Sequence, residues 1–417
     1  KEIAEKKNYD MKRASDDFYN GGFKIYSTID PNLQNYVDKV FSNPSAYGIN
    51  ASSGSDIQAS MTILDYKGHV VALSGGIGQK TENLGYNRAL QAVRQPGSTM
   101  KPIAAYAPAI DKKLKIQGKI ATYSTIVPDF NKTYNLGGKT WKPNNWYGGH
   151  WDSKTIQFAV MRSMNTVPVE IVDLLTPDFC YDFLTKKLGI TTLNEEDKNL
   201  SPLGMGGTNG GLTTFESAAA YAVFGNDGRY YAPCLYYKVC DQYDNVVLEN
   251  KEKSTYAIAS DTATVMNKIL QTVVDNSQGT GAGIRSIISK DMKIYAKTGT
   301  SNNANDLWFV GGTPYYVASC WCGYDTPRDV KPENIAWKLW GNVMKEVHKD
   351  LPAKDFEISP DVRCYKYCTH TGDLATDKCP STAIGWYKKN GLPSVCKSHP
   401  GTALGMISSN NEEKKAS

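Results

Sequence analysis

Three absences limit what this chain can be before any motif is considered. No run of about 18 apolar residues occurs and no signal-peptide pattern opens the sequence, so the sequence predicts no membrane-spanning segment here. The glycines at 75–78 are followed by neither a G-x-G-x-x-G pattern nor a Walker lysine, so they predict a loop rather than a phosphate site. The net charge of +5 is small and dispersed, which gives no indication of nucleic-acid binding.

The composition is that of a globular protein with one large domain and one or two small ones. The chain has 417 residues, of which 41% are hydrophobic and 21% charged. It begins abruptly with the charged, helix-forming segment 1–7, which we expect to be the interior of a longer protein. The composition changes from about residue 352 to the end of the chain.

Strand patterns occur early and late in the chain. Alternating residues at 23–29 predict a half-buried strand, followed by a helix with Asp30 or one of its neighbours as its cap and Pro31 in its first turn. Residues 58–65 and 67–73 predict a hairpin, and three more strands are predicted at 292–300, 307–312 and 315–324. We expect these five strands to form one antiparallel sheet.

Helical patterns fill the sequence between these strands. They are predicted at 153–175, 215–224, 262–274 and 335–347. The expected fold class is therefore α+β, an antiparallel sheet flanked by helices with a separate, mainly helical lobe. An aromatic-rich stretch at 129–151 is irregular, and we favour packing over a cleft wall as its role.

One candidate nucleophile lies in the segment Gln95-Pro96-Gly97-Ser98-Thr99-Met100-Lys101-Pro102. Ser98 and Lys101 are three residues apart, so they share a helix face. Pro102 has no N–H to donate to the Ser98 carbonyl, so the first helical turn should be irregular. Serine needs a neighbouring base, and a lysine can serve if its pKa is lowered by burial or a nearby cation. Alone, the pattern S-x-x-K is weak, because it recurs by chance.

Two further motifs follow in the chain, Ser163-x-Asn165 and Lys297-Thr298-Gly299. Acyl transfer at a peptide carbonyl requires a nucleophile, a base, an oxyanion hole and an acid for the leaving amine. Ser98 can attack, Lys101 can accept its proton, and Ser163 can relay a proton to the leaving nitrogen. Asn165 can hydrogen-bond a substrate amide.

The Lys297 strand has features suited to substrate binding. Period-two alternation places Thr298 and Thr300 on one face, where their hydroxyls could bind a substrate carboxylate near the Lys297 charge. Gly299 would leave room for a substrate backbone to add along the strand. The backbone N–H groups of Ser98 and Thr300 are the expected oxyanion donors.

The three motifs in this order resemble those of penicillin-binding proteins, and longer segments narrow the resemblance to the transpeptidase portion of the class A (bifunctional) members. These segments are residues 22–31, 87–89, 210–214 with Glu216, and 306–311. The resemblance covers about residues 21–345. It implies the fold shared by these transpeptidases and serine β-lactamases, with 1–54 as a connector, 55–347 as the transpeptidase domain and 348–417 as a Cys-containing appendage and tail.

The resemblance also implies a function. A DD-transpeptidase attacks the D-Ala-D-Ala end of a peptidoglycan stem peptide, releases D-Ala and transfers the acyl group to an amine of a neighbouring strand. β-Lactams would acylate Ser98, and no cofactor or metal is expected. The implied partners are stem peptides, β-lactams and the cell-wall synthesis machinery. The implied location is the extracytoplasmic face of the cell membrane, with the anchor and the glycosyltransferase domain outside this chain.

Three other functions share parts of this pattern. A serine β-lactamase needs a hydrolytic base, and the E-x-x-L-N loop of that family is missing, although Glu195 and Glu196 lie in the right region. A DD-carboxypeptidase differs mainly in using water as the acceptor. A penicillin sensor would be acylated without turnover, and the connector motif disfavours it.

The nine cysteines fall into two groups. The upstream five, at 180, 234, 240, 320 and 322, are expected to be small core hydrophobes. For Cys364, Cys368, Cys379 and Cys396 we favour two disulfides, as in Cys-containing tails of Gram-positive relatives at the cell surface. A Cys₄ or Cys₃His zinc site is the alternative, although no C-x₂-C pair is present. Residues 410–417 are expected to be a disordered tail.

Overall fold

A computed structural model describes residues 1–50, 56–130 and 132–407 of the protein. The predicted boundary between residues 54 and 55 and the predicted tail at 410–417 lie outside the described residues. Among the helices that are described, none is both long enough and apolar enough to cross a bilayer.

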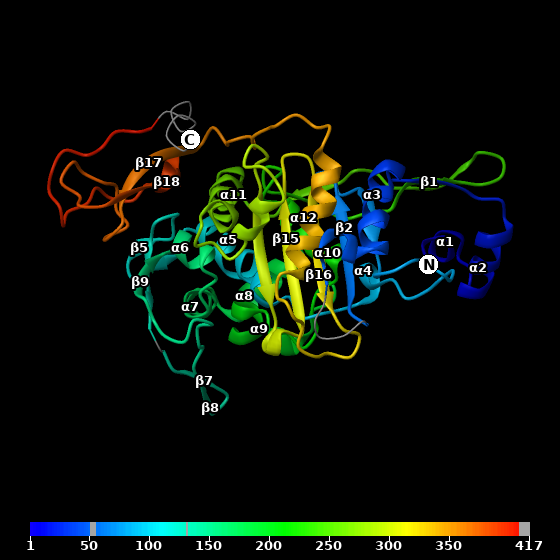
Figure 1. The fold of residues 1–417 in the computed structure, drawn as a ribbon, viewed down its shortest axis with the longest axis horizontal. Helices are drawn as coiled ribbons and strands as arrows, with labels where there is room; N and C mark the ends of the chain where they lie inside the picture. Colours follow the sequence, from blue (N-terminus) through cyan, green and yellow to red (C-terminus); the bar gives the residue numbers. More distant parts are fainter. Residues whose placement is uncertain (51–55, 131, 408–417) are drawn as a thin grey trace.

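A five-stranded antiparallel sheet forms the centre of the molecule (Figure 1). Its strand order is β14-β15-β16-β2-β3. The strands are β14 Tyr295–Thr300, β15 Asp306–Gly312, β16 Val317–Gly323, β2 Gln58–Leu64 and β3 Val70–Ser74. The prediction that an early hairpin and three late strands share one antiparallel sheet is confirmed.

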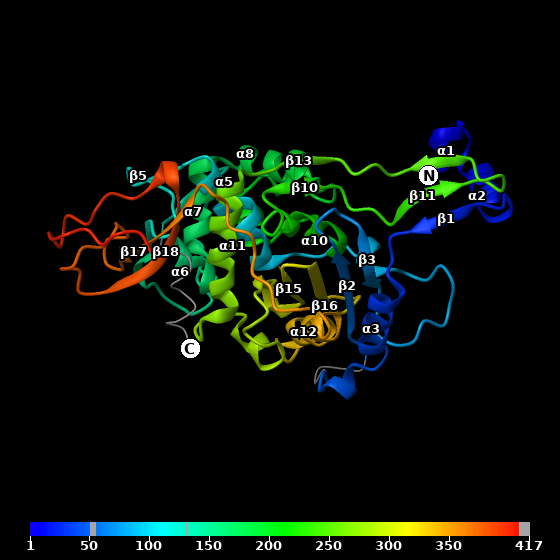
Figure 2. The same ribbon diagram turned by 90° about the horizontal axis from the view of Figure 1, so that it is seen from above.

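Both faces of this sheet are buried, because alternate side chains of each strand enter different cores. On β15, Leu307 and Phe309 face one core, whereas Trp308 and Val310 face the other. The first face is covered by α3 (Pro31–Ser42) and α12 (Ile335–His348), and the second by α10 (Thr214–Ala222) and α11 (Ser260–Asp275), as Figure 2 shows. The predicted Asp30 cap of α3 is confirmed, since its carboxylate accepts the Asn32 N–H at 2.8 Å.

A helical lobe lies beside the second face, next to α11 (Figure 1). Its helices share the larger core with α10, α11 and the inner side of the sheet. They are α5 Ala107–Asp111, α6 Ile156–Met161, α7 Thr166–Leu175, α8 Pro177–Asp182 and α9 Leu200–Met205, with π-helical turns at Pro102–Tyr106 and Phe183–Lys187. Three small hairpin-like sheets border the lobe: β4 Lys115–Ile116 with β5 Lys119–Ile120, β6 Ile126–Asp129 with β9 Asp152–Thr155, and β7 Tyr134–Leu136 with β8 Lys139–Trp141.

An N-terminal arm extends from the opposite side of the molecule (Figure 2). Its strand β1 (Lys24–Ser27) was predicted to be half-buried, but it is exposed along its whole length. It pairs with β11 (Tyr236–Cys240), which pairs with β12 (Val246–Glu249), so its faces lie outside both large cores. The helices α1 Glu2–Lys7 and α2 Met11–Asn20 also lie in this arm, whereas β10 Arg229–Tyr231 pairs with β13 Ser254–Tyr256 beside α10, nearer the middle of the molecule (Figure 2).

The prediction of one helical stretch over residues 153–175 is wrong. Residues Asp152–Thr155 form strand β9, and the helical part is divided into α6 and α7 by a turn at 162–165. The Thr155 side chain caps α6 by accepting the Phe158 N–H at 3.1 Å. A left-handed residue at Ser163 then ends α6, for a reason given below.

The C-terminal appendage is a hairpin with long loops, formed by β17 (Val362–Cys368) and β18 (Thr382–Lys388). It contacts the helical lobe, because Tyr387 donates to the Ser124 hydroxyl at 2.8 Å and Trp386 joins the larger core. The division of the chain into three parts stays a prediction.

The cysteines differ in part from expectation. Four of the upstream five are buried, as expected for small core residues, and Cys234 is only half-buried. The disulfide prediction for the other four is not what the structure shows, since no disulfide joins any of the nine cysteines, all of which are described. Cys368, Cys379 and Cys396 converge instead on His399, and Cys364 lies outside this group.

Candidate active site

Ser98 lies in a short 3₁₀ turn, Gly97–Thr99, which is held tightly between neighbouring elements. The Gly97 N–H donates to the Gly206 carbonyl at 3.3 Å, and the Trp308 indole N–H of β15 donates to the Gln95 carbonyl at 2.8 Å. Gly97 has φ 51°, and a Cβ there would lie 2.4 Å from the Thr300 carbonyl oxygen. Only glycine allows this turn to lie against β14. The half-buried Ser98 side chain is thereby fixed beside the edge of the sheet.

The helix after Ser98 is irregular, as predicted from Pro102. The chain passes from the 3₁₀ turn through helical residues at Met100 and Lys101 into a π-helical turn at Pro102–Tyr106. Proline cannot donate the N–H that a regular helix would direct at the Ser98 carbonyl, and a π-bulge absorbs the loss. Lys101 follows Ser98 by three residues and is fully buried.

Ser163 lies at the end of α6 in a backbone conformation that usually requires glycine. Its N–H bonds the Val160 carbonyl and the Met164 N–H bonds the Ala159 carbonyl, the pattern of a Schellman motif. Ser163 occupies the left-handed position of this motif, with φ 55°. A serine costs on the order of 1 kcal/mol there relative to glycine. This turn divides the predicted long helix and directs the serine hydroxyl inward.

Lys101 directs its amine at this turn. Its Nζ lies 2.6 Å from Asn165 Oδ1, 2.9 Å from the Ser163 carbonyl oxygen and 3.4 Å from Ser163 Oγ. A neutral amine has two N–H groups and one lone pair, and the two shorter contacts are to oxygens that can only accept. The lone pair of a neutral Lys101 is therefore left for a hydroxyl proton.

Lys297 reaches the same hydroxyl from the sheet. It lies on β14, the edge strand next to the Ser98 turn, and its Nζ donates to Ser163 Oγ at 2.8 Å and to the Thr298 carbonyl at 3.1 Å. Lys101, Ser163 and Lys297, which are far apart in the sequence, thus meet around one oxygen atom. The structure therefore brings one residue of each of the three motifs together around Ser163 Oγ, while the role of each residue stays a prediction.

Both lysines have lowered pKa values. Burial, and secondarily repulsion from the Lys297 ammonium, holds the pKa of Lys101 well below its usual value. Burial alone lowers the pKa of Lys297 from 10.5 to about 7. Burial and the neighbouring Lys297 ammonium thus both favour the neutral form of Lys101, which is the form that can act as a base.

Asn165 has both ends of its side chain engaged within the protein. Nδ2 donates to the Asn144 carbonyl at 2.6 Å, which fixes the amide orientation because a carbonyl can only accept, and Oδ1 accepts from Lys101 at 2.6 Å. The Asn165 backbone N–H donates to Asn145 Oδ1 at 2.8 Å. The Asn145 side chain therefore accepts a backbone N–H at the N-terminal end of α7, where the Asn165 side chain makes no capping hydrogen bond.

Buried Asp129 organises the aromatic stretch that carries Asn145. Its carboxylate accepts from Asn145 Nδ2 at 2.8 Å, Thr166 Oγ1 at 2.6 Å, Tyr147 OH at 2.7 Å and the Trp151 N–H at 2.7 Å. Burial alone would raise the pKa of Asp129, but these hydrogen bonds outweigh it and lower the pKa below its usual value. Asp129 thus holds the stretch at 129–151 against the protein by hydrogen bonds, in line with the packing role that we favoured over a cleft wall. Through Asn145, the stretch also positions Asn165.

The Lys297 strand shows the expected alternation. Lys297 and Gly299 are buried, whereas Thr298 is half-buried and Thr300 exposed. Thr298 shares a hydrogen bond of 2.7 Å with Thr280 from the loop after α11. A Cβ at Gly299 would lie 2.5 Å from the Pro96 carbonyl oxygen, so the structure gives this glycine a role in close packing against the Ser98 turn. β14 pairs with β15 on one side only, among the described strands.

Sequence reasoning missed three contributors to this site. Asn145, Asp129 and Thr280 are each isolated polar residues outside the three motifs. Asn145 lies in a stretch rich in Asn, Gly, Tyr and Trp, and nothing in its spacing indicates which amide would meet α7. Only the fold brings these residues to the motifs.

Comparison with known proteins gives the family. A family profile described as the penicillin binding protein transpeptidase domain matches residues 59–322. The chain belongs to this family. Penicillin-binding protein 1A of Clostridium acetobutylicum is 34% identical over 345 residues, which cover 81% of this chain and 42% of that protein. Penicillin-binding protein 1A of Clostridium tetani is 32% identical over 402 residues, covering 91% and 50%. The chain thus spans about half the length of these relatives, and the predicted resemblance to class A penicillin-binding proteins is confirmed.

Solved structures agree on the fold. Penicillin-binding protein 1A from Haemophilus influenzae matches with a TM-score of 0.75 at 18% identity, covering 94% of this chain and 76% of that one. The PonA1 protein from Mycobacterium tuberculosis in complex with penicillin V matches with a TM-score of 0.68 at 22% identity, covering 85% and 93%. The predicted α+β fold of the penicillin-binding protein transpeptidases is confirmed.

Proposed function

We propose that this chain is a serine DD-transpeptidase that cross-links peptidoglycan stem peptides through an acyl-enzyme on Ser98. The observation that carries the proposal is the position of the Ser163 hydroxyl, 2.8 Å from Lys297 Nζ and 3.4 Å from Lys101 Nζ. Both lysines are fully buried and have lowered pKa values. A hydroxyl between two such amines is arranged to carry protons during acyl transfer.

Acylation begins with Lys101. Its neutral amine takes the Ser98 hydroxyl proton as Oγ attacks the carbonyl carbon of the penultimate D-Ala. The carbonyl electron pair moves to oxygen, and the backbone N–H groups of Ser98 and Thr300 are the donors we assign to that oxyanion. Support for this pair is that the turn carrying Ser98 lies directly against the Thr300 backbone. A Cβ at Gly97 would be only 2.9 Å from the Thr300 nitrogen.

Collapse of the tetrahedral intermediate breaks the carbon–nitrogen bond. The leaving D-Ala nitrogen takes a proton from Ser163 Oγ, which is replenished from the ammonium of Lys101. The products are an ester on Ser98 and free D-Ala. Lys297 remains charged beside Ser163 and provides a cation for the terminal carboxylate of the substrate, which Thr298 and Thr300 can also contact.

Deacylation reverses this sequence with a different amine. The acceptor amine attacks the ester carbonyl and loses one proton through Ser163 and Lys101, and that proton returns to Ser98 Oγ as the ester bond breaks. The stem peptide would lie along the unpaired edge of β14, as an added strand next to Gly299. Asn165 would contact a substrate amide after exchanging one of its present partners.

A β-lactam should use the acylation half of this reaction only. Opening of the ring breaks the same kind of carbon–nitrogen bond, but the leaving nitrogen stays attached and blocks the acceptor. The complex of the PonA1 protein with penicillin V supports this extension by similarity. The proposed partners are therefore stem peptides, β-lactams and the cell-wall synthesis machinery, and the proposed location is the extracytoplasmic face of the cell membrane.

The experiment that separates the candidate reactions is acceptor-dependent release of D-Ala. The protein is incubated with a D-Ala-D-Ala pentapeptide, with and without an amine acceptor, and both D-Ala and the cross-linked product are quantified. A transpeptidase forms cross-linked product in proportion to acceptor. Release that ignores the acceptor identifies a carboxypeptidase, and stoichiometric acylation without turnover identifies a sensor.

A further inference from the structure

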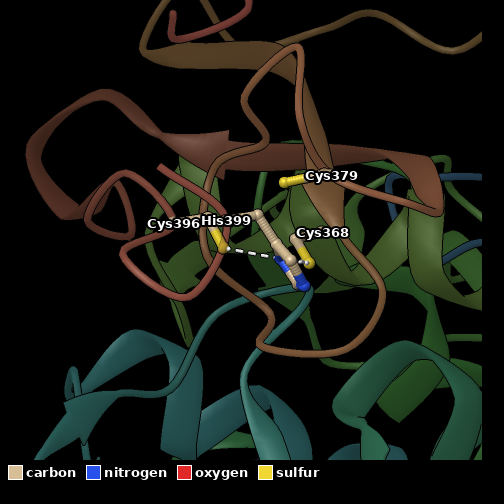
Figure 3. A group of neighbouring side chains, drawn as sticks. All are labelled: Cys368, Cys379, Cys396 and His399. Atoms are coloured by element: carbon tan, nitrogen blue, oxygen red, sulfur yellow. Dashed lines mark hydrogen bonds between the residues drawn. The ribbon is translucent and has the colours of Figure 1, made fainter. Parts of the chain in front are cut away.

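Four potential metal ligands converge in the loops of the C-terminal appendage (Figure 3). Cys368 ends β17, Cys379 lies in the turn before β18, and Cys396 and His399 lie in the loop after β18. Their ligand atoms all lie within 4.8 Å of one another. The elements around them come from three separate parts of the appendage, so the fold itself creates the cluster.

Two distances inside the cluster, both to His399, are close to those of a tetrahedral metal site. His399 Nδ1 lies 3.3 Å from Cys396 Sγ and 3.5 Å from Cys368 Sγ. In a tetrahedron with ordinary zinc–sulfur and zinc–nitrogen bond lengths, the sulfur and nitrogen atoms are ~3.6 Å apart. One ion at the centre of the cluster would therefore reach the ligands with small shifts of the side chains.

Disulfides explain the cluster less well. Two disulfides would need four paired thiols, but Cys364 is not in the cluster, and its carbonyl accepts the Ile407 N–H at 2.9 Å in a separate part of the hairpin. Three thiols can form one disulfide and leave one cysteine over. The imidazole of His399, which contacts two of the sulfurs, has no role in a disulfide.

The surrounding groups stabilise thiolate ligands. The Thr376 N–H donates to Cys379 Sγ at 3.3 Å, and the Thr371 hydroxyl donates to Cys396 Sγ at 3.4 Å. The Thr376 hydroxyl also donates to the His399 carbonyl at 2.6 Å, which holds the loop that carries the imidazole. Donors to coordinating sulfurs and supports for a ligating histidine are usual around structural metal sites.

We propose that Cys368, Cys379, Cys396 and His399 bind one structural Zn²⁺ ion. Three thiolates and one imidazole in tetrahedral geometry are the ligands that zinc prefers. Four protein ligands leave no open position, so the ion has no place for substrate or activated water. Binding releases the protons of those cysteines that are still thiols.

The zinc would hold the appendage loops against the helical lobe. Asp373, five residues after Cys368, forms an ion pair of 2.9 Å with Lys119, and the Gly372 carbonyl accepts from the buried Ser124 hydroxyl at 2.6 Å. A metal that fixes both ends of this loop also fixes these two contacts. The appendage has few regular elements of its own, and small units of this kind often depend on a metal.

The direct test is metal content together with thiol counting on the whole chain, purified without chelators. Native mass spectrometry and elemental analysis should give one zinc per chain. Alkylation under denaturing conditions with a chelator should modify all nine cysteines, with no disulfide. Zinc-free protein containing a disulfide among Cys368, Cys379 and Cys396 would overturn the proposal.

Matched variants locate the ion. Cys396→Ser and His399→Ala should each lower zinc affinity by at least tenfold, whereas Cys364→Ala, in the same hairpin but outside the cluster, should keep one zinc per chain. His399→Cys should also keep the ion, because it restores a fourth ligand. Equal zinc content in all four variants would identify adventitious binding and overturn the proposal.

Cobalt substitution gives a readout that does not depend on the stability of the variants. Co²⁺ added to the apo form of the native protein should give the intense visible bands of a tetrahedral ion and thiolate charge-transfer bands. His399→Cys should strengthen the charge-transfer absorption, because it adds a fourth thiolate. The weak bands of a six-coordinate ion in the native protein would refute the site.

Discussion

Replacing Lys297 with methionine should make the folded protein more stable near neutral pH while it removes the proposed activity. The side chain is fully buried, and its two hydrogen-bond partners, Ser163 Oγ and the Thr298 carbonyl, carry no charge. No carboxylate accepts a hydrogen bond from its Nζ among the described residues. The ammonium of Lys297 is therefore kept in the core at a cost that methionine, of similar length, does not have.

The pKa of Lys297 gives the size of this cost. A fall from 10.5 to about 7 on folding corresponds to about 5 kcal/mol, at about 1.4 kcal/mol for each pH unit. The two lost hydrogen bonds offset this by about 1 kcal/mol each. The free energy of unfolding should therefore be about 2–3 kcal/mol higher for the variant than for the native protein at or just below pH 7.

The pH dependence makes the prediction specific. The folded pKa is lower than the unfolded pKa, so between pH 7 and 10.5 the unfolded native chain binds more protons than the folded one. The native protein consequently gains stability relative to Lys297→Met as the pH rises, and the difference should change sign near about pH 9. Groups distant from Lys297 titrate alike in both proteins and cancel in the difference, whereas the pKa of Lys101 should rise in the variant because the Lys297 ammonium no longer repels it.

Thermal unfolding of both proteins at a series of pH values measures this difference. We expect the variant to melt on the order of 4 °C higher near pH 7 and no higher near pH 9. Lys290→Met, at an exposed lysine earlier in the same segment, serves as the control and should change the unfolding free energy by less than about 0.5 kcal/mol. A variant that is less stable than the native protein at pH 7, or a difference that does not vary with pH, would refute the reasoning.

Three further predictions concern the same site. Ser163→Gly should change stability little, because the gain of about 1 kcal/mol from a glycine at φ 55° is offset by the lost hydrogen bond from Lys297, and it should slow β-lactam acylation by about 10²–10⁴-fold; faster or equal acylation contradicts the relay role. Gly299→Ala should destabilise the fold by about 1–3 kcal/mol through its clash with the Pro96 carbonyl, whereas Gly405→Ala, in open space, should not, as thermal unfolding will show. The acylation rate, followed by stopped-flow, should fall as the pH is lowered and Lys101 gains a proton; a rate constant that does not change with pH over the whole range in which the protein stays folded would contradict this.

The sequence predicted the sheet and the three motifs because both are local patterns. The strands at 307–312 and 315–324 are short runs rich in apolar residues, as expected of strands with two buried faces, and Pro102 predicts the irregular helix after Ser98 by its chemistry alone. In the folded protein, β14 lies next to the Ser98 turn. The fold alone therefore explains why the three motifs lie close together.

The missed features depend on conformations or partners that have no local signal. Ser163 is in the left-handed region, where propensity predicts glycine or asparagine, so residues 153–175 resemble one continuous helix. Asn145 and Asp129 acquire their roles only from contacts across about 20 to 40 residues of chain. In the appendage, Cys396 and His399 have the C-x₂-H spacing of metal ligands, which is a local signal for the proposed zinc site even without a C-x₂-C pair.

Intact mass spectrometry after incubation with benzylpenicillin tests the central claim most directly. We predict one covalent adduct per chain, located by peptide mapping to the peptide that carries Ser98, and no adduct on Ser98→Ala. We also predict greatly slowed formation in Lys101→Met, because no base remains to take the Ser98 proton. A correctly folded native protein that forms no adduct, or forms it at a residue other than Ser98, would contradict the account.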